Sequence, residues 1–209
     1  MLSTIITVFV VVFLIANLVI YIIDWRRSNK EYEFLNQNAE EQLYSKPINS
    51  KKYAGKWFEV ALLPNFFESN CVGAIAEYKL NGYGFDVVNT CLQSDGSQNS
   101  VSGVATPFEA ANQFKDRWAK VEFFGSALPN IYSRLFQGDY LILYVEESLD
   151  NANYQAAIVG SIDKNYLWIL SRTPNLDQTK LENLIEIAKK KGYDVSKLQI
   201  HDLTVYNKL

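Results

Sequence analysis

Two stretches of the chain decide its fold: Tyr53-Ala54-Gly55-Lys56-Trp57-Phe58-Glu59-Val60-Ala61 and, more than a hundred residues later, Tyr166-Leu167-Trp168-Ile169-Leu170-Ser171-Arg172-Thr173-Pro174. Each is rich in aromatic and aliphatic residues that fit a pleated surface, so each is predicted to be a β-strand. The first offers the indole ring of Trp57, and the second offers the guanidinium of Arg172, which can stack on such a ring. We expect the strands to meet where a sheet closes on itself, with the function inside it.

The composition describes a β-rich chain with few reactive side chains. The 209 residues include 13 Tyr, 12 Phe and 4 Trp, and 20 basic residues stand against 23 acidic ones. This near balance disfavours a nucleic-acid partner, which needs a basic face. With one His and two Cys, no cluster has the spacing of metal ligands, so we expect no metal and no cofactor. His201 is interpreted as a surface or strand-edge residue, and no catalytic residue is predicted.

Short strand-like runs alternate with turns from residue 52 onward. Asn81-Gly82-Tyr83-Gly84 is typical of a hairpin turn, because Asn and Gly accept a positive φ. A ninth strand, 198–203, follows a helix that Asp177 caps and Gly192 ends. The eight earlier runs lie at 55–63, 71–80, 85–92, 100–108, 117–124, 139–146, 154–161 and 166–171.

This order predicts an all-β fold: an eight-stranded antiparallel up-and-down barrel with a C-terminal helix packed outside it. A barrel of this size can hold one small ligand. A β-sandwich is the alternative. Evenly spaced hairpins without a long crossover favour the barrel.

The N-terminal segment is long and apolar enough to be a membrane anchor. Ile5 to Ile23 would form a helix of about 28 Å, close to the thickness of a bilayer core. A cleaved signal peptide is the alternative, but its apolar region is usually shorter and ends near a small-residue cleavage site. Here Asp24-Trp25-Arg26-Arg27 follows the run, without a small-x-small site. We predict an anchor at 1–25, a polar linker at 26–48 and a barrel domain at 49–205. The anchor adds a transmembrane helix to the fold.

The motifs resemble those of the lipocalins, in particular the group of bacterial lipocalins and apolipoprotein D. Gly55-Lys56-Trp57 resembles the Gly-x-Trp motif of their first strand, and Trp168-Ile169-Leu170-Ser171-Arg172-Thr173-Pro174 resembles their last strand and its exit. The likeness covers about residues 49–205. It implies a structural role for Gly55, Trp57 and Arg172, which close one end of the barrel. This chain departs from the bacterial members in having an apparent membrane span instead of a lipoprotein cysteine.

Cys71 and Cys91 lie at equal distances from residue 81, inside the predicted turn, so a simple hairpin would bring them together. Some bacterial lipocalins carry a similar pair. We predict a disulfide; two free thiols in a reducing compartment are the alternative. A disulfide requires an oxidising compartment, such as a periplasm, a lumen or the extracellular space. Arg26 and Arg27 after the span favour the opposite orientation by the positive-inside rule, so the topology stays open.

The resemblance implies non-enzymatic binding or transport of a small hydrophobic or amphipathic ligand, of the lysophospholipid or fatty acid class. The apolar span adds that the protein is tethered to a membrane by its N-terminal helix. The alternatives are an enzyme built on the same barrel and a structural or interaction module whose barrel is filled by its own aromatic rings. Strand alternation predicts the cavity candidates Glu59, Ala61, Trp168 and Leu170, with Tyr140 as a polar contact.

Overall fold

The computed structural model describes residues 2–123 and 137–208, so Phe124 at the end of the fifth predicted strand lies outside the described residues. The chain forms two units, residues 1–38 and residues 39–209. The first unit contains α1 (Leu2–Gln37), a single helix of 36 residues. From Ile6 onward α1 is long and apolar enough to span a membrane by length and composition, and its apolar 18-residue window has a mean hydropathy of 2.9. It continues through the first half of the expected linker.

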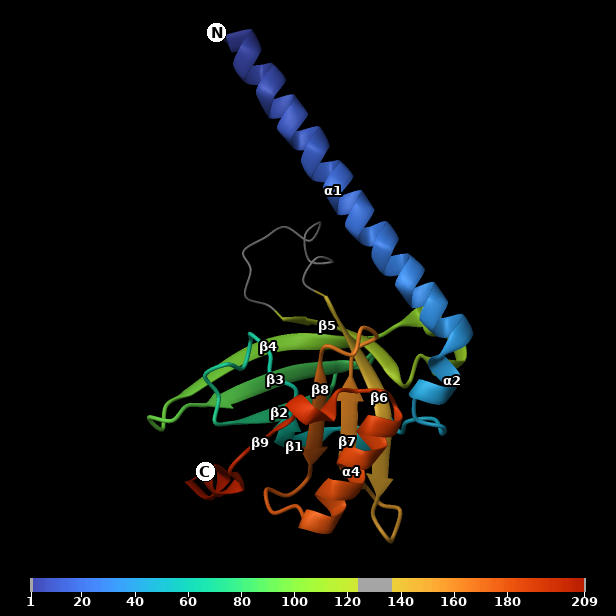
Figure 1. Ribbon diagram of the computed structural model, residues 1–209, viewed down its shortest axis with the longest axis vertical. Helices are drawn as coiled ribbons and strands as arrows, with labels where there is room; N and C mark the ends of the chain where they lie inside the picture. The colour runs from blue at the N-terminus through green and yellow to red at the C-terminus, as the bar shows by residue number, and fades with distance from the viewer. Residues whose placement is uncertain (1, 124–136, 209) are drawn as a thin grey trace. The chain divides into compact units, whose positions relative to one another are not determined.

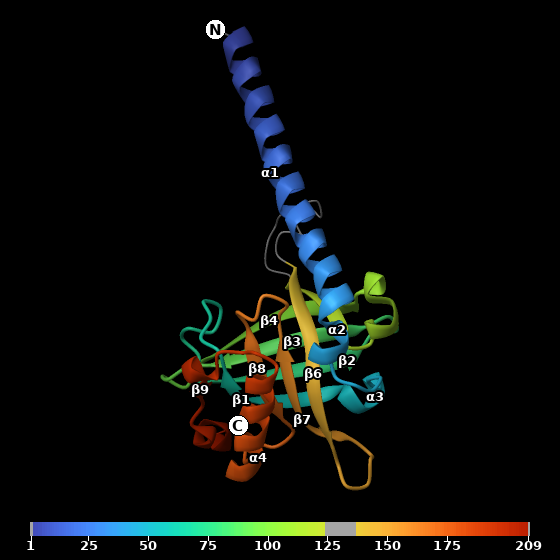
Figure 2. The same ribbon diagram turned by 45° about the vertical axis from the view of Figure 1, so that its right-hand side comes forward.

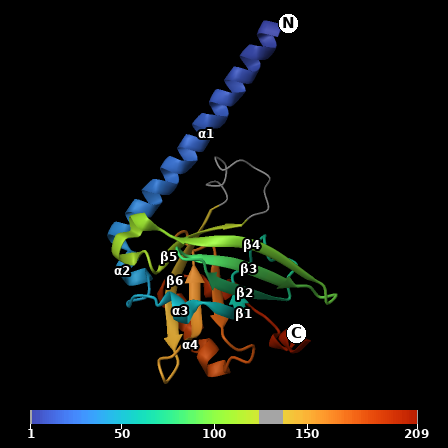
Figure 3. The same ribbon diagram turned by 180° about the vertical axis from the view of Figure 1, so that it is seen from behind.

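The second unit is a closed antiparallel barrel, as predicted (Figure 1). Neighbouring strands pair in chain order from β2 to β8, and β1 closes the sheet by pairing with both β8 and β2. Figure 3 shows β1 to β4 from the side opposite to the view of Figure 1. The strands are β1 (Gly55–Leu62), β2 (Gly73–Leu80), β3 (Phe85–Leu92), β4 (Gln98–Pro107), β5 (Trp118–Phe123), β6 (Gly138–Glu147), β7 (Tyr154–Gly160) and β8 (Leu167–Ser171).

Short helices flank the barrel, and α4 (Gln178–Lys190) packs on its outer surface beside β7 (Figure 2). The Asp177 side chain caps α4 by accepting hydrogen bonds from two backbone N–H groups, as the sequence predicts. Leu181, Leu184 and Ala188 form the buried stripe of this helix. The shorter helices are α2 (Ala39–Gln42), α3 (Ser50–Tyr53), η1 (Glu109–Phe114), η3 (Val195–Lys197) and η4 (Leu203–Lys208).

The ninth strand is much shorter than the predicted 198–203. It is β9 (Gln199–Ile200), which pairs with β1 at Ala61 and Leu62. The chain then turns into η4, and the Tyr206 hydroxyl lies 2.5 Å from the Glu59 carbonyl oxygen and 3.0 Å from the Ala74 amide nitrogen. Because β1 pairs with β2 only up to Phe58, this C-terminal segment supplies hydrogen bonds where the two strands separate.

The predicted disulfide is present between Cys71 and Cys91. The two cysteines are not directly opposite, because the hairpin register pairs Cys91 with Ala74. Cys71 instead precedes β2 and is held in the β1–β2 turn. With a separation of 20 residues, the bridge should stabilise the fold by about 3 kcal/mol through loop-closure entropy.

One end of the barrel is closed by Arg172 and Trp57, as the motifs predict. The guanidinium carbon lies 3.8 Å from the centroid of the indole ring. The guanidinium also donates to five carbonyl oxygens, those of Lys52, Tyr53, Ala54, Lys56 and Tyr154, at 2.7–3.2 Å. Gly55 has a φ of +99°, and an added Cβ would come within 3.3 Å of this guanidinium.

We predict that Arg172→Lys lowers the free energy of unfolding by about 2–4 kcal/mol, because an ammonium cannot serve five carbonyls and stack on the ring at once. Unfolding of the full-length protein in detergent micelles, followed against guanidinium concentration, measures the loss. Lys56→Ala is the control, because that side chain is half exposed. If Arg172→Lys and the control are equally stable, the guanidinium does not hold this end closed.

Candidate functional site

The interior faces of β1 and β8 meet above the closed end. Glu59 is directly opposite Leu170, and Leu62 is directly opposite Trp168. Opposite residues of an antiparallel pair point to the same face. Leu170 belongs to the interior cluster that includes Trp57, and Trp168 packs against it. The structure therefore places Glu59, Trp168 and Leu170 on the inner face, while their contact with a ligand stays a prediction.

The inward orientation expected for Ala61 is wrong. A bulge lies between Glu59 and Ala61, and Ala61 pairs with Ile169 rather than with Trp168. Because Ile169 alternates with Leu170, it lies on the outer face, and Ala61 lies there with it. Strict alternation from Trp57 cannot foresee this extra residue. Leu62 occupies the inner position instead.

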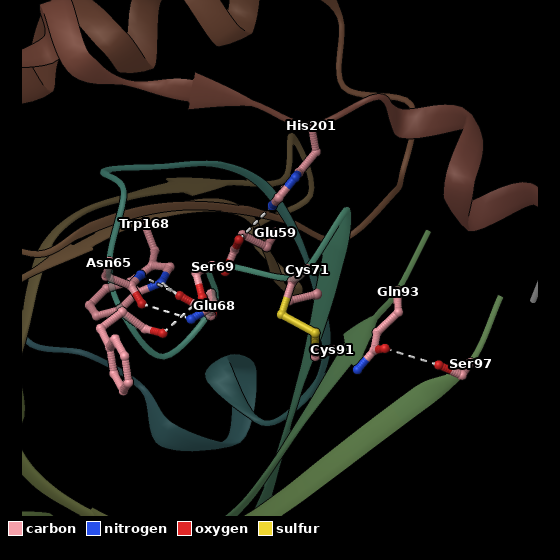
Figure 4. Close-up of a disulfide and its surroundings, with 12 residues drawn as sticks. Glu59, Asn65, Glu68, Ser69, Cys71, Cys91, Gln93, Ser97, Trp168 and His201 are labelled. Atoms are coloured by element: carbon pink, nitrogen blue, oxygen red, sulfur yellow. Dashed lines mark hydrogen bonds and ion pairs between the residues drawn. A yellow bond between two sulfur atoms is a disulfide. The ribbon is translucent and has the colours of Figure 1, made fainter. Parts of the chain in front are cut away.

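A buried carboxyl–imidazole pair lies just above the closed end. The Nε2 atom of His201 is 2.6 Å from Oε1 of Glu59, and their side chains are only 8% and 5% exposed, respectively (Figure 4). The interpretation of His201 as a surface residue is therefore wrong, whereas its place next to β9, at the end of the sheet, agrees with the strand-edge alternative. The backbone of His201 follows β9 and donates to the Val60 carbonyl, so pairing of β9 with β1 carries its ring onto Glu59.

A second carboxyl joins this pair from the β1–β2 turn. Glu68 lies close enough to Glu59 to raise the pKa of that carboxyl. One oxygen of Glu68 also accepts from Nε1 of Trp168 at 2.9 Å and from Nδ2 of Asn65 at 2.6 Å (Figure 4). The Asn-x-x-Glu spacing of the turn is its local signal, because Asn65 also accepts from the backbone N–H of Glu68.

Burial sets the protonation of this cluster. Burial, followed by the neighbouring Glu68 carboxyl, raises the pKa of Glu59 well above its usual range. Burial lowers the pKa of His201, although the Glu68 charge and a hydrogen bond to the backbone of Val72 oppose that change. If His201 donates to Val72 through Nδ1, then Nε2 is the acceptor for a proton carried by Glu59. The favoured state is therefore a neutral pair with the proton on the carboxyl.

Tyr140, predicted as a polar contact, belongs to a row of three tyrosine hydroxyls. Its hydroxyl is 2.7 Å from that of Tyr53 and 2.9 Å from that of Tyr78. Burial raises the pKa of all three phenols, so they stay neutral. The row satisfies these polar groups inside the barrel and adds aromatic bulk next to Trp57.

Several inward-facing residues farther from the closed end keep accessible surface. Val101 pairs with Asn89, and Phe123 pairs with Gly103, which places both on the inner face, yet each is 40% exposed. An added Cβ at Gly138 would meet no described atom within 4 Å. The amide oxygen of Asn89 is buried without a hydrogen-bond partner among the described residues. This part of the interior is therefore less filled than the closed end.

The chemistry of the site is that of an apolar barrel with a few polar contacts. Within the described residues, no group of three or more His, Cys, Asp or Glu side chains could hold a metal ion. Glu59, Glu68 and His201 provide an acid–base cluster with hydrogen-bonding capacity. Aromatic and small aliphatic side chains provide the remaining inner surface.

Known proteins are similar to this chain over its barrel domain. A family model described as a lipocalin-like domain matches residues 48–202. Temperature-induced lipocalin-1 of Arabidopsis thaliana is 34% identical over 154 residues, covering 73% of this chain and 78% of that protein. Outer membrane lipoprotein Blc of Vibrio cholerae is 34% identical over 158 residues, covering 73% and 83%. The solved structure of insecticyanin from the tobacco hornworm Manduca sexta matches with a TM-score of 0.55 and 25% identity, covering 75% of this chain and 83% of that one.

We predict that Glu59→Gln becomes more stable, relative to the unsubstituted protein, as the pH rises from about 4.5 to 8. A raised pKa means that the folded state holds a proton that the unfolded chain has lost, so stability falls as pH rises through that window. Glutamine removes this fall. The lowered pKa of His201 acts in the opposite direction below its ordinary value, and this effect remains in the variant.

Thermal unfolding midpoints across this pH range measure the effect, with Glu77→Gln as the control, because that side chain is 56% exposed. If the curves for Glu59→Gln and the unsubstituted protein run parallel, the pKa of Glu59 is not raised in the folded protein, and the neutral pair is contradicted.

Proposed function

The chain belongs to the lipocalin family, and from this premise we propose that its barrel binds or transports a lysophospholipid or a fatty acid without catalysing a reaction. Lipocalins are generally binders of small hydrophobic ligands. The ligand class, the membrane tether and the lack of catalysis are parts of the proposal. The observation that carries it is the contrast between the two ends of the barrel interior.

At the closed end, aromatic rings fill the space. Tyr53 and Trp57 have ring centroids 5.1 Å apart, and Tyr78 packs edge-on against Tyr53 at 5.6 Å. Farther along the strands, the inner faces carry accessible residues, such as Val101 and Phe123, which are each 40% exposed. An acyl chain fits such an apolar interior, because its burial is favourable and needs no hydrogen-bond partner.

Polar groups next to this space suit the head of an amphiphile. The amide oxygen of Asn89 has no partner among the described residues and needs a donor, which a ligand hydroxyl or a water molecule would supply. Trp168 and Glu59 are inner-face neighbours across the β1–β8 pair, and Glu68 links to both. We propose Glu59, Trp168, Leu170 and Tyr140 as ligand contacts, directly or through the groups that they hold.

An enzyme is the second candidate, and one observation favours it. Two carboxyls and an imidazole converge at Glu59, and shifted pKa values are common at catalytic sites. The described geometry also has a structural explanation, because the cluster ties the C-terminal segment and the β1–β2 turn to β1. Incubation of the protein with an added lysophospholipid, followed by chemical analysis of the recovered lipid, separates the two functions, since only an enzyme would convert it.

We also propose that residues 1–25 anchor the chain in a membrane, that residues 26–48 link the anchor to the barrel, and that residues 49–205 form the barrel domain. The apolar length of α1 supports the anchor. The Cys71–Cys91 disulfide supports an oxidising compartment, and the similarity to an outer membrane lipoprotein supports a membrane location.

We predict that Ala76→Phe weakens ligand binding by about tenfold or more, because a phenyl ring on the inner face occupies the space of an acyl chain. Ala76 packs against the interior cluster and keeps some exposure. Titration of the full-length protein with a fluorescent fatty acid and with a fluorescent lysophospholipid gives the two affinities.

Lys79→Phe is the matched control, because Lys79 is exposed on the outer face of the same strand, β2. The proposal predicts normal affinity for this control. Equal affinities of the two variants, or no binding of either probe by the unsubstituted protein, would contradict a ligand inside the barrel.

A further inference from the structure

The β1–β2 turn exposes two adjacent phenylalanine rings. Phe66 is 88% exposed and Phe67 is 78% exposed. Exposing two such rings side by side is unfavourable in water, and adjacent exposed apolar residues mark interaction sites. Leu149 is similarly exposed, but it lies alone among polar residues in the β6–β7 hairpin, at the opposite end of the strands.

The turn is held in the shape that exposes these rings. The Asn65 side chain accepts from the Glu68 N–H at 3.0 Å, and the Ser69 hydroxyl donates to the Phe66 carbonyl at 3.2 Å. The Cys71 N–H donates to the Glu68 carbonyl, and the disulfide ties Cys71 to β3. A turn fixed at both ends cannot easily fold its rings against the barrel. The hydrogen bonds and the disulfide of the turn therefore keep these rings exposed.

Aromatic contacts connect the exposed rings with the barrel interior. Phe66 packs on Phe67 with centroids 6.2 Å apart, and Phe67 packs on Tyr166 at 6.3 Å. Tyr166 stacks on Trp168 at 5.9 Å, and Trp168 packs against the interior cluster. We call these four residues the aromatic strip. It runs from the surface of the β1–β2 turn to the inner face of β8.

The turn carries one acidic side chain, which is held by hydrogen bonds. Glu68 is the only ionisable side chain between Pro64 and Asn70, and its carboxyl accepts hydrogen bonds from Trp168 and Asn65. This segment contains no basic side chain that could bind phosphate groups. A surface that binds here must therefore be recognised through apolar contact.

We propose that Phe66 and Phe67 dock the barrel on a lipid bilayer and that the aromatic strip is the path by which lipid enters. This inference rests on the proposed function and names the surface from which the ligand comes. The occupant is a bilayer because the same chain carries α1, which is long and apolar enough to keep each copy attached to one. Aromatic rings are favoured where a protein meets the lipid interface.

Contact is tested with a tryptophan reporter in the full-length protein, reconstituted into phosphatidylcholine vesicles whose acyl chains carry bromine. Phe67→Trp should lose most of its added emission to the bromine, and the loss should persist at high salt because the contact is apolar. Leu149→Trp is the matched control and should keep its added emission. Absence of quenching at position 67, or equal quenching at both positions, would overturn the proposal.

The entry path is tested by the rate at which the barrel takes up a fluorescent lysophospholipid from vesicles. Phe66→Ser with Phe67→Ser should slow uptake about tenfold or more, while the equilibrium affinity stays unchanged. Leu149→Ser should leave both unchanged. An unchanged uptake rate with normal affinity overturns the inference and leaves the proposed function intact. If the unsubstituted protein binds no lipid, the proposed function fails, while the quenching experiment still decides whether the turn contacts a bilayer.

Discussion

The rest of the barrel depends on the contact between the Arg172 guanidinium and the Trp57 ring. Trp57 lies in β1 and Arg172 follows β8. Their contact therefore links the first strand of the barrel to the eighth. Five carbonyl oxygens converge on the same guanidinium, three of them from α3 and its C-cap, so the short helix is fixed beneath the barrel. A planar cation with several donors can do this, whereas lysine cannot. Closure at this end fixes which residues of β1 and β8 face inward.

The other end of β1 is organised by a change of partner. After Phe58, β1 no longer pairs with β2, a bulge follows Glu59, and β9 takes over at Ala61. His201 and Tyr206 reach Glu59 because of this change. The His201 ring contacts the Glu59 carboxyl, and the Tyr206 hydroxyl donates to the Glu59 backbone carbonyl. The buried acid–base cluster is therefore a consequence of how the C-terminal segment completes the sheet. The same cluster orients Trp168, through Glu68, at the inner end of the aromatic strip.

Much of the fold was predictable because its signals are local. Turn residues such as Asn81 and Gly82 separate the strands, and the Asp177 side chain caps the N-terminus of α4. Trp57 and Arg172 were identifiable through family motifs, and Cys71 with Cys91 through their spacing. The disulfide forms although the β2–β3 register pairs Cys91 with Ala74 rather than with Cys71. It forms because the turn before β2 brings Cys71 close to β3.

The candidate site was less predictable because it depends on pairings between distant segments. Glu59 and His201 are 142 residues apart, and only β9 pairing brings them together. Glu68 comes from a turn, where alternation says nothing about the direction of a side chain. Ala61 was misplaced because a single bulge residue reverses the alternation of a strand. Periodicity thus gives the barrel and its inner face up to Glu59, but not the polar cluster.

The central claim is that the barrel carries a lipid in its native setting. Native mass spectrometry of the full-length protein, released gently from the membrane in which it was produced, tests this directly. The account predicts a chemically intact fatty acid or lysophospholipid bound one to one, on a chain that retains α1 and the Cys71–Cys91 bridge. A chain that carries no bound lipid would contradict it.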